Sequence, residues 1–300
     1  MSQVKLDLES TLGPAKELEL PQGRLRYRER GSGPPILFVH GLLVNGALWR
    51  NVVDQLAPDA RCITPDWPLG SHDLPLSPEA DRSPAGMARL IADTMEALDL
   101  QDVTLVGNDS GGALCQMVVT SHPERVGRLV LTDCDAFDNF PPKMFMYLLW
   151  ASRVPAVLGL LLQSMRVRFM RRAPIAFGWL TKRPLPPGVS DAYALPILRD
   201  RGVRDDAAAF MVGAHKSNLD AVTERLGEFR RPVLIAWAPE DRFFPFEHAE
   251  RLASIFPDSR LERIEDSRTF VSEDQPKRLA ELIAAFVREP AVSDRKGALT

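Results

Sequence analysis

The chain has 300 residues, of which 45% are hydrophobic, so it is long enough to bury a substantial core and is not expected to be disordered. Its formal net charge of −3 comes from nearly balanced acids and bases, which gives no global field to favour nucleic acid or another highly charged partner. Its three cysteines lack the CxxC spacing of a metal or redox site. The N-terminus has no basic stretch followed by an apolar one, so we expect no secretory signal and a cytoplasmic location.

Short apolar runs rich in β-branched residues recur along the chain and predict buried parallel strands. These runs are residues 35–40, 61–66, 103–107, 128–133 and 232–238. Helical patterns separate them; for example, Met87, Leu90 and Ile91 have the spacing of one helix face. The alternation predicts an α/β fold with a mostly parallel sheet flanked by helices and a site at the carboxyl ends of the strands.

The alternation stops at residues 140–219, where strand patterns disappear and methionine, leucine and arginine become frequent. We interpret this segment as a helical cap inserted into a core formed by residues 1–139 and 220–300. Residues 144–165 are apolar, but Arg153 and Pro155 interrupt them and four arginines follow. We therefore expect no stable membrane insertion, and peripheral membrane contact remains the alternative interpretation.

The predicted strand at residues 103–107 runs directly into the sequence GNDSGG at residues 107–112. A sharp turn from a strand into a helix strains its central residue, and glycines two positions before and after it leave room for the neighbouring chain. Gly107 and Gly111 frame Asp109 in this way. A turn centred on Ser110 would have Asn108 in place of the first glycine. We therefore predict that Asp109 is the reactive residue.

Two further segments have residues at positions where an oxyanion hole and a catalytic acid would accompany a reactive Asp109. Leu42 follows the strand that ends with His40, where its backbone N–H can form an oxyanion hole together with that of Ser110. His40 itself is predicted to be either a structural turn residue or a substrate contact. Asp241 follows the strand at residues 232–238, the position of the acid in the chain order nucleophile, acid, histidine.

Taken together, these motifs resemble the α/β-hydrolase superfamily, and within it the haloalkane dehalogenase and epoxide hydrolase branch that uses an aspartate nucleophile. The resemblance covers roughly residues 23–287 and includes the segments 48–51, 123–126, 239–241 and 273–276. It implies an α/β-hydrolase fold. The methionine, leucine, phenylalanine and tryptophan content of the predicted cap suggests an apolar pocket for a small, largely apolar substrate. We expect no metal and no organic cofactor, because the turn at Asp109 needs neither.

The chain departs from this family at positions that matter for catalysis. Such dehalogenases hold the departing halide with an asparagine and a tryptophan, and the corresponding positions here are Leu42 and Ser110, so dehalogenation loses support. The histidine that activates water is replaced by Thr269, which cannot titrate near neutral pH. His215, near the end of the cap, is the candidate replacement base.

Several other side chains are predicted to contact substrate. Epoxide hydrolases that resemble this chain donate protons from cap tyrosines, which makes Tyr147 and Tyr193 candidates, although simple packing explains them nearly as well. The remaining predicted contacts are Trp150, Phe243 and Thr269.

Three functions remain open from the sequence. The first is a hydrolase in which Asp109 forms a covalent ester and His215 or a cap carboxylate activates water. The second is a lyase, isomerase or cyclase in which Asp109 acts as an acid or base. The third is a catalytically degenerate protein that binds a ligand in the capped pocket.

Overall fold

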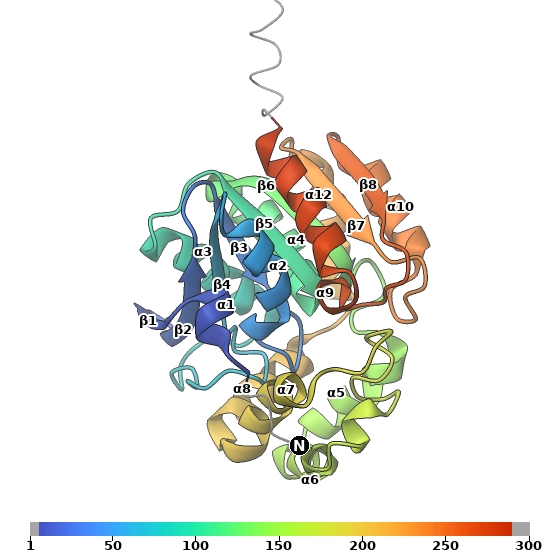
Figure 1. Cartoon of the computed structure of the whole chain (residues 1–300). Helices are drawn as coiled ribbons and strands as arrows, with labels where there is room; N and C mark the ends of the chain where they lie inside the picture. Colours follow the sequence, from blue (N-terminus) through green and yellow to red (C-terminus); the bar gives the residue numbers. More distant parts are fainter. Residues whose placement is uncertain (1–5, 290–300) are drawn as a thin grey trace, which may run out of the picture.

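The computed structural model describes residues 6–289, and its centre is a sheet of eight strands (Figure 1). The strand order is β1-β2-β4-β3-β5-β6-β7-β8; β1 and β2 pair antiparallel, β2 pairs antiparallel with β4, and the strands from β4 onward are parallel. The bounds are β1 Ala15–Leu20, β2 Gly23–Arg30, β3 Pro35–Val39, β4 Arg61–Pro65, β5 Val103–Asp109, β6 Val126–Cys134, β7 Val233–Trp237 and β8 Ser259–Arg263. This architecture confirms the predicted α/β fold with a mostly parallel sheet.

The five predicted strands correspond to β3, β4, β5, β6 and β7, with ends that differ by one or two residues. Three strands were missed by the prediction: β1, β2 and β8. They lie at or next to the edges of the sheet, and their sequences AKELEL, GRLRYRER and SRLER are rich in charged residues. A strand with one solvated face does not give the continuous apolar run that identifies a strand buried on both faces.

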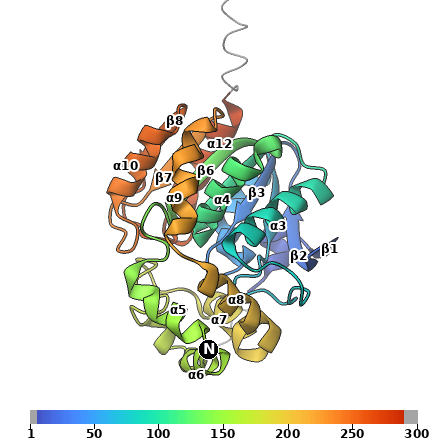
Figure 2. The same ribbon diagram turned by 180° about the vertical axis from the view of Figure 1, so that it is seen from behind.

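Helices cover both faces of the sheet. One face carries α1 (Leu8–Leu12), α2 (Arg50–Leu56) and α12 (Pro276–Arg288) (Figure 1). The other carries α3 (Pro84–Ala97), α4 (Ser110–Ser121) and α9 (Ser217–Arg225) (Figure 2). Two further helices, α10 (Phe246–Ile255) and α11 (Val271–Asp274), follow β7 and β8. The predicted helix around Met87 is α3, which Ser83 caps by accepting a hydrogen bond from Gly86 N at 3.1 Å.

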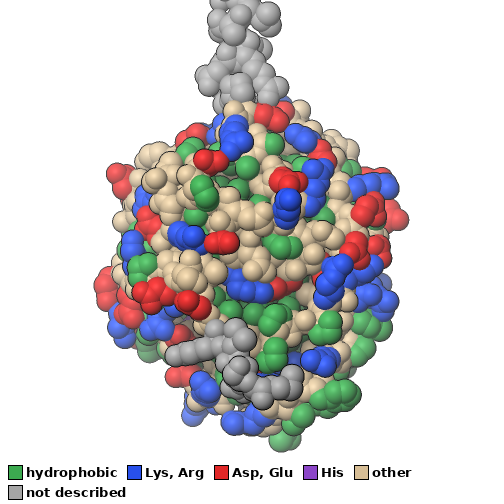
Figure 3. Space-filling model, in the orientation of Figure 1, with side chains coloured by type: hydrophobic (Ala, Val, Ile, Leu, Met, Phe, Trp, Pro, Cys, Tyr) green, Lys and Arg blue, Asp and Glu red, His purple; other side chains and the backbone are tan. Residues whose placement is uncertain are grey.

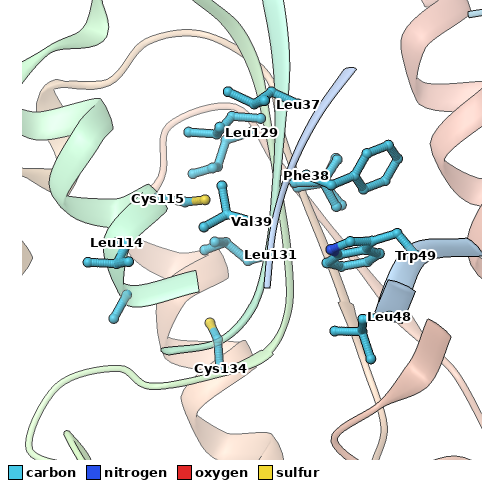
Figure 4. Packing of buried hydrophobic residues seen from close by; sticks show 14 of the residues in the cluster. Leu37, Phe38, Val39, Leu48, Trp49, Leu114, Cys115, Leu129, Leu131 and Cys134 are labelled. Atoms are coloured by element: carbon cyan, nitrogen blue, oxygen red, sulfur yellow. The ribbon is translucent and has the colours of Figure 1, made fainter. Parts of the chain in front are cut away.

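The central strand β3 shows how the core is packed. Its side chains alternate between the two faces of the sheet: Phe38 points toward Trp49, whereas Val39 points toward Cys115 (Figure 4). The Phe38 and Trp49 rings lie 5.0 Å apart between centroids, and both side chains are fully buried. Burial of each such side chain contributes about 1.5–3 kcal/mol, so this layer holds the carboxyl ends of β3 and β5 at fixed positions.

The segment between β6 and β7 forms a helical lobe at one end of the sheet (Figure 1). It contains α5 (Met146–Ser152), α6 (Pro155–Leu162), α7 (Pro187–Arg199) and α8 (Arg201–Gly213). Their buried faces form a second apolar cluster that includes Leu148, Leu158, Val203 and Met211. Because α9 packs against α4 of the core, we propose that the cap ends near residue 214, a few residues before the boundary predicted from the sequence.

The apolar stretch at residues 144–165 is divided in the structure. It forms α5 and α6, which are separated at Arg153 and Val154, and then a 3₁₀ turn at Gln163–Arg166. Pro155 has no backbone N–H and starts α6, which explains the break. Of the helices in residues 6–289, none combines the length and the apolar character needed to cross a membrane.

Candidate active site

Asp109 lies at the turn between β5 and α4. Its backbone has φ 55° and ψ −134°, a conformation that a residue with a side chain rarely adopts. The glycines around it allow α4 to approach the strands closely. A Cβ at Gly107 would lie 2.7 Å from Cys115 Sγ, and one at Gly111 would overlap the carbonyl oxygen of Val39. The glycine spacing therefore fits the local packing of the turn.

The Asp109 carboxylate is held by backbone donors. The N–H groups of Leu42 and Ser110 donate hydrogen bonds to it. Burial, with a smaller contribution from the charge of Asp241, nevertheless raises the pKa of Asp109 to about 7, although the two hydrogen bonds act to lower it. Near neutral pH this carboxyl group is therefore divided between its ionised and protonated forms.

An open cavity with about 910 Å³ of empty space lies between Asp109 and the cap. Most of its lining is apolar: Leu42, Leu43, Pro141, Pro142, Phe145, Leu148, Leu161, Leu162, Met165, Met170, Ala173, Ile175, Ala176, Phe177 and Leu180. Hydroxyl groups enter the lining from Ser110, Tyr147 and Ser164. The Tyr147 hydroxyl donates a hydrogen bond to the Ile175 carbonyl oxygen at 2.8 Å. A lining of this kind is typical of sites that bind small apolar molecules and orient them with a few polar groups.

Asp241 lies in the loop after β7 and is paired with Thr269. The Thr269 hydroxyl donates to Asp241 Oδ2 at 2.6 Å, while the N–H groups of Phe243 and Phe244 donate to Oδ1 at 2.6 and 2.8 Å. Burial raises the pKa of Asp241 to about 6 despite these hydrogen bonds. Thr269 thus makes the hydrogen bond to the acid that the resemblance assigns to a histidine.

Asn108 connects this pair to the turn that carries Asp109. Its Nδ2 donates to the Thr269 carbonyl oxygen at 2.7 Å and to Thr132 Oγ1 at 3.0 Å. The side chain is buried, so these bonds fix the Thr269 backbone relative to β5. This arrangement gives Asn108 a structural role next to Asp109.

Two acids at the end of β6 were not predicted from the sequence. Asp133 accepts hydrogen bonds from Ala238 N at 3.0 and 3.2 Å, and Asp135 N donates to the Asp109 carbonyl oxygen at 3.4 Å. Burial raises the pKa of both carboxyls, and the charges of Asp241 and Asp109, respectively, raise them further. Two acids at the carboxyl end of the strand that follows the elbow helix are a signal that could have identified them.

The structure contradicts the prediction that His215 replaces the base. His215 is exposed at the start of α9, where its N–H donates to Asn218 Oδ1 at 2.7 Å and its Nδ1 contacts Ser217 Oγ at 2.8 Å. Local hydrogen bonds at the N-terminus of a helix hold it there, outside the set of residues that line the cavity.

His40 is a structural residue rather than a substrate contact. It is fully buried, its Nε2 accepts a hydrogen bond from Trp67 N at 2.8 Å, and its Nδ1 donates to the Gly41 carbonyl oxygen at 2.9 Å. Burial lowers the pKa of His40 to about 3, so the ring is neutral at physiological pH. Both ring nitrogens are used to hold the turn that presents the Leu42 N–H.

Of the predicted contacts in the cap, Tyr147 lines the cavity, and two others do not. Trp150 is 67% exposed on the outside of α5. Tyr193 is buried, and its hydroxyl donates to Glu273 Oε1 at 2.9 Å, where Arg50 also binds both carboxylate oxygens of Glu273. The Tyr193 hydroxyl therefore has a buried partner of its own, and Tyr193 is not among the residues that line the cavity.

Phe243 and Thr269 are also absent from the lining of the cavity. Phe243 packs against the lining residue Phe145, with 5.0 Å between ring centroids, and Thr269 is fully buried with its hydroxyl bonded to Asp241. Within residues 6–289, no group of three or more histidine, cysteine, aspartate or glutamate side chains is arranged to hold a metal ion.

We predict that Gly41→Ala displaces the Asp109 carboxylate, because a Cβ at this position would overlap Oδ2 of Asp109. A misplacement of about 1 Å costs roughly 100-fold in rate. Gly227→Ala is the matched control, since the nearest atom to its Cβ would be 3.6 Å away. Steady-state kinetics of both variants checks this, and full activity of Gly41→Ala would show that the carboxylate position does not matter.

Comparisons with known proteins identify the family and agree with the fold. The model of the α/β hydrolase fold family matches residues 34–276. An uncharacterised protein of Mycobacterium bovis is 30% identical over 288 residues, covering 91% of this chain and 81% of the relative. Haloalkane dehalogenase 2 of Mycobacterium bovis is 27% identical, covering 87% of this chain and 91% of the relative. The solved structure of the epoxide hydrolase CorEH superposes with a TM-score of 0.76 at 19% identity, covering 91% and 98% of the two chains. The chain therefore belongs to the α/β hydrolase fold family, and its relatives include haloalkane dehalogenases.

Proposed function

We propose that this protein is a hydrolase in which Asp109 attacks an electrophilic carbon of a small apolar substrate and forms an alkyl ester. One observation carries the proposal: a carboxylate on a strained elbow lines an apolar cavity while two backbone N–H groups bind it. The N–H groups of Leu42 and Ser110 fix the orientation of the carboxylate. A carboxylate held in this way needs little reorganisation before it attacks.

In the first step, a lone pair of an Asp109 carboxylate oxygen forms a C–O bond while the bond from carbon to the leaving group breaks. An epoxide oxygen needs a proton as it leaves, and the Tyr147 hydroxyl in the cavity lining would supply it by exchanging its hydrogen bond to the Ile175 carbonyl oxygen for one to the substrate. Halide departure has less support, because the side chains of Leu42 and Ser110 offer neither the amide nor the indole donor that the family uses. We therefore favour an aliphatic epoxide over a haloalkane as substrate.

In the second step, water attacks the carbonyl carbon of the ester. The N–H groups of Leu42 and Ser110 would stabilise the resulting oxyanion. The proton of water would pass to Asp241 through the Thr269 hydroxyl, which donates to Asp241 at 2.6 Å and would give up its own proton as it gains one. The tetrahedral intermediate would then collapse by breaking the bond between the carbonyl carbon and the alkyl oxygen, which takes the proton back from Asp241 and leaves as the alcohol. The second proton of water, left on the Asp109 carboxyl, would return to the Tyr147 oxygen. Because threonine is a far weaker base than histidine, we expect ester hydrolysis to limit turnover.

The replacement of the base histidine by Thr269 also favours a second function. The pKa of Asp109 is raised to about 7 by burial, which suits a group that gives and takes protons near neutral pH. A lyase, isomerase or cyclase that uses Asp109 in this way needs no base to activate water. A protein that only binds a ligand would show no multiple turnover at all.

Turnover in water labelled with oxygen-18 distinguishes these functions. We expect the label to enter the Asp109 carboxylate and the product to gain one water molecule. Peptides that contain Asp135 and Asp241 serve as internal controls and should stay unlabelled. Turnover of an epoxide without label in Asp109 would reject the covalent mechanism, and a product isomeric with its substrate would favour the acid–base function.

A further inference from the structure

The outer face of the cap has a surface unlike the rest of the protein. We propose that this face docks onto an anionic lipid bilayer. We call this surface the cap patch and define it as the exposed apolar side chains between residues 144 and 175. The docking proposal stands on the surface itself, and only its consequence for substrate entry rests on the proposed function.

The cap patch concentrates the exposed apolar side chains of the protein. Among the side chains that the structure describes, every large hydrophobic residue with high exposure except Val212 lies within residues 144–175. The most exposed are Trp150 at 67%, Leu160 at 75% and Phe169 at 76%. Single exposed apolar residues are ordinary, but a concentration in one segment marks an interaction surface.

Helix α6 is the clearest part of the patch. Its sequence PAVLGLLL has no polar side chain, so it is apolar all around. One face is buried in the cap through Leu158 and Leu162, whereas Val157 and Leu160 on the other face are exposed. A helix that is apolar on all sides is normally buried, so the exposed face of α6 lacks its partner.

Charge identifies the kind of partner. Residues 139–190 contain eight lysines and arginines and no aspartate or glutamate, although the whole chain carries −3. Arg168 and Arg171 pair with Asp191, and Lys182 and Arg183 pair with acids of the core. The other four, Lys143, Arg153, Arg166 and Arg172, form no ion pair with any residue in the range 6–289. Basic side chains lie among apolar ones at the cap end of the molecule, at the bottom of Figure 3.

The cavity opens within the cap patch. Leu161, Met170 and Ile175 are exposed members of the patch, and they also line the cavity that contains Asp109. A second cavity, with about 620 Å³ of empty space, lies next to it and shares Phe177 with its lining. Of its basic lining residues, Arg168, Arg171, Lys182 and Arg183 are paired with carboxylates, whereas Arg172 forms no ion pair within residues 6–289 and suits an anionic headgroup.

These features favour a bilayer over a second copy of the chain or another protein. In a symmetric dimer through the cap patch, the basic side chains of one copy would face those of the other, which is repulsive. A protein partner on the patch would cover the mouth of the cavity. A bilayer satisfies the apolar and basic side chains together, and under the proposed function an apolar substrate would enter the cavity from the lipid.

Flotation of the purified full-length protein with vesicles tests the proposal. We expect binding to phosphatidylcholine–phosphatidylglycerol vesicles, weaker binding to phosphatidylcholine alone, and loss of binding as salt is raised. Tryptophan fluorescence should shift to shorter wavelength on binding to the mixed vesicles, and the Trp150→Phe variant should lose this shift.

Two double variants locate the surface. Leu160→Ser with Phe169→Ser should weaken vesicle binding at least about tenfold. Arg153→Gln with Arg172→Gln should weaken binding to the anionic vesicles by about tenfold. Val212→Ser is the matched control, because Val212 is 53% exposed but lies outside the patch, and it should bind as the wild type does.

The proposal fails if the protein stays unbound with anionic vesicles, or if the Leu160→Ser, Phe169→Ser variant binds as tightly as Val212→Ser. A dimer that dissociates in that double variant, in a protein that does not bind vesicles, would assign the patch to self-association instead. All substituted positions are exposed, and thermal melts check that each variant is folded.

Discussion

Asp109→Asn should abolish turnover, with a loss of about 10⁴-fold or more, because an amide nitrogen and oxygen cannot replace the attacking carboxylate. The variant keeps the shape of the side chain, so the cavity and the elbow should remain intact. Steady-state kinetics with an aliphatic epoxide measures the loss. Asp220→Asn at an exposed position of α9 is the control and should retain full activity.

The same variant should change how stability depends on pH. Burial raises the pKa of Asp109 to about 7, well above its value of 3.8 in the unfolded chain, so the folded state holds the proton that the unfolded state has lost. The free energy of unfolding should therefore fall as pH rises from about 4 to about 7, by about 1.4 kcal/mol for each pH unit. Asp109→Asn removes this contribution. Chemical unfolding should show that the difference in stability between the two proteins is constant below about pH 4, changes by about 1.4 kcal/mol for each pH unit between pH 4 and 7, and is constant again above pH 7.

Thr269→His should restore the missing base. The imidazole would stand beside Asp241, which accepts the Thr269 hydroxyl at 2.6 Å and is positioned to accept an imidazole N–H instead. A positioned general base contributes about 10²- to 10⁴-fold, so we expect the hydrolysis of the ester to accelerate by that factor while its formation is unchanged. Pre-steady-state kinetics separates the two phases: the wild type should show a burst followed by slow turnover, and the variant should show fast turnover without a burst.

The larger side chain at position 269 also changes packing, because Thr269 is fully buried. Overpacking costs about 1–3 kcal/mol, so Thr269→Gln serves as the control of similar size without a base. Thr269→Gln should turn over no faster than the wild type. If Thr269→His is folded and still forms the ester but hydrolyses it at the rate of Thr269→Gln, the Thr269 position does not limit the reaction.

The fold was predictable where strands are buried on both faces. The strand β3 is a continuous apolar run because Phe38 and Val39 are packed on opposite faces of the sheet. In contrast, β8 has charged residues at three of its five positions and an exposed face, so its pattern gives no such signal. The break between α5 and α6 could be predicted from Pro155, but the burial of one face of α6 depends on contacts with the rest of the cap.

The candidate site was predictable where backbone geometry determines the residue type. Glycine spacing predicted that Asp109 lies at the turn after β5, and chain order predicted that Asp241 lies in the loop after β7, because both positions depend on local turns after strands. Cap residues were less predictable, since the direction of a side chain depends on how short helices pack. Tyr147 and Trp150 are three residues apart on α5, yet Tyr147 lines the cavity and Trp150 is exposed outside it. His215 was chosen by elimination among the histidines, and no feature of the sequence specified which way it faces.

The central claim is that Asp109 forms a covalent bond with the substrate carbon. The most direct test is to incubate the purified wild type with an aliphatic epoxide, digest it, and measure the mass of the peptide that contains Asp109. Because Thr269 is a weak base, hydrolysis of the Asp109 ester should be slow and the adduct should accumulate. We therefore predict that this peptide gains the full mass of the epoxide and that fragmentation assigns the gain to Asp109. An unmodified Asp109 in a protein that consumes the epoxide would contradict the account.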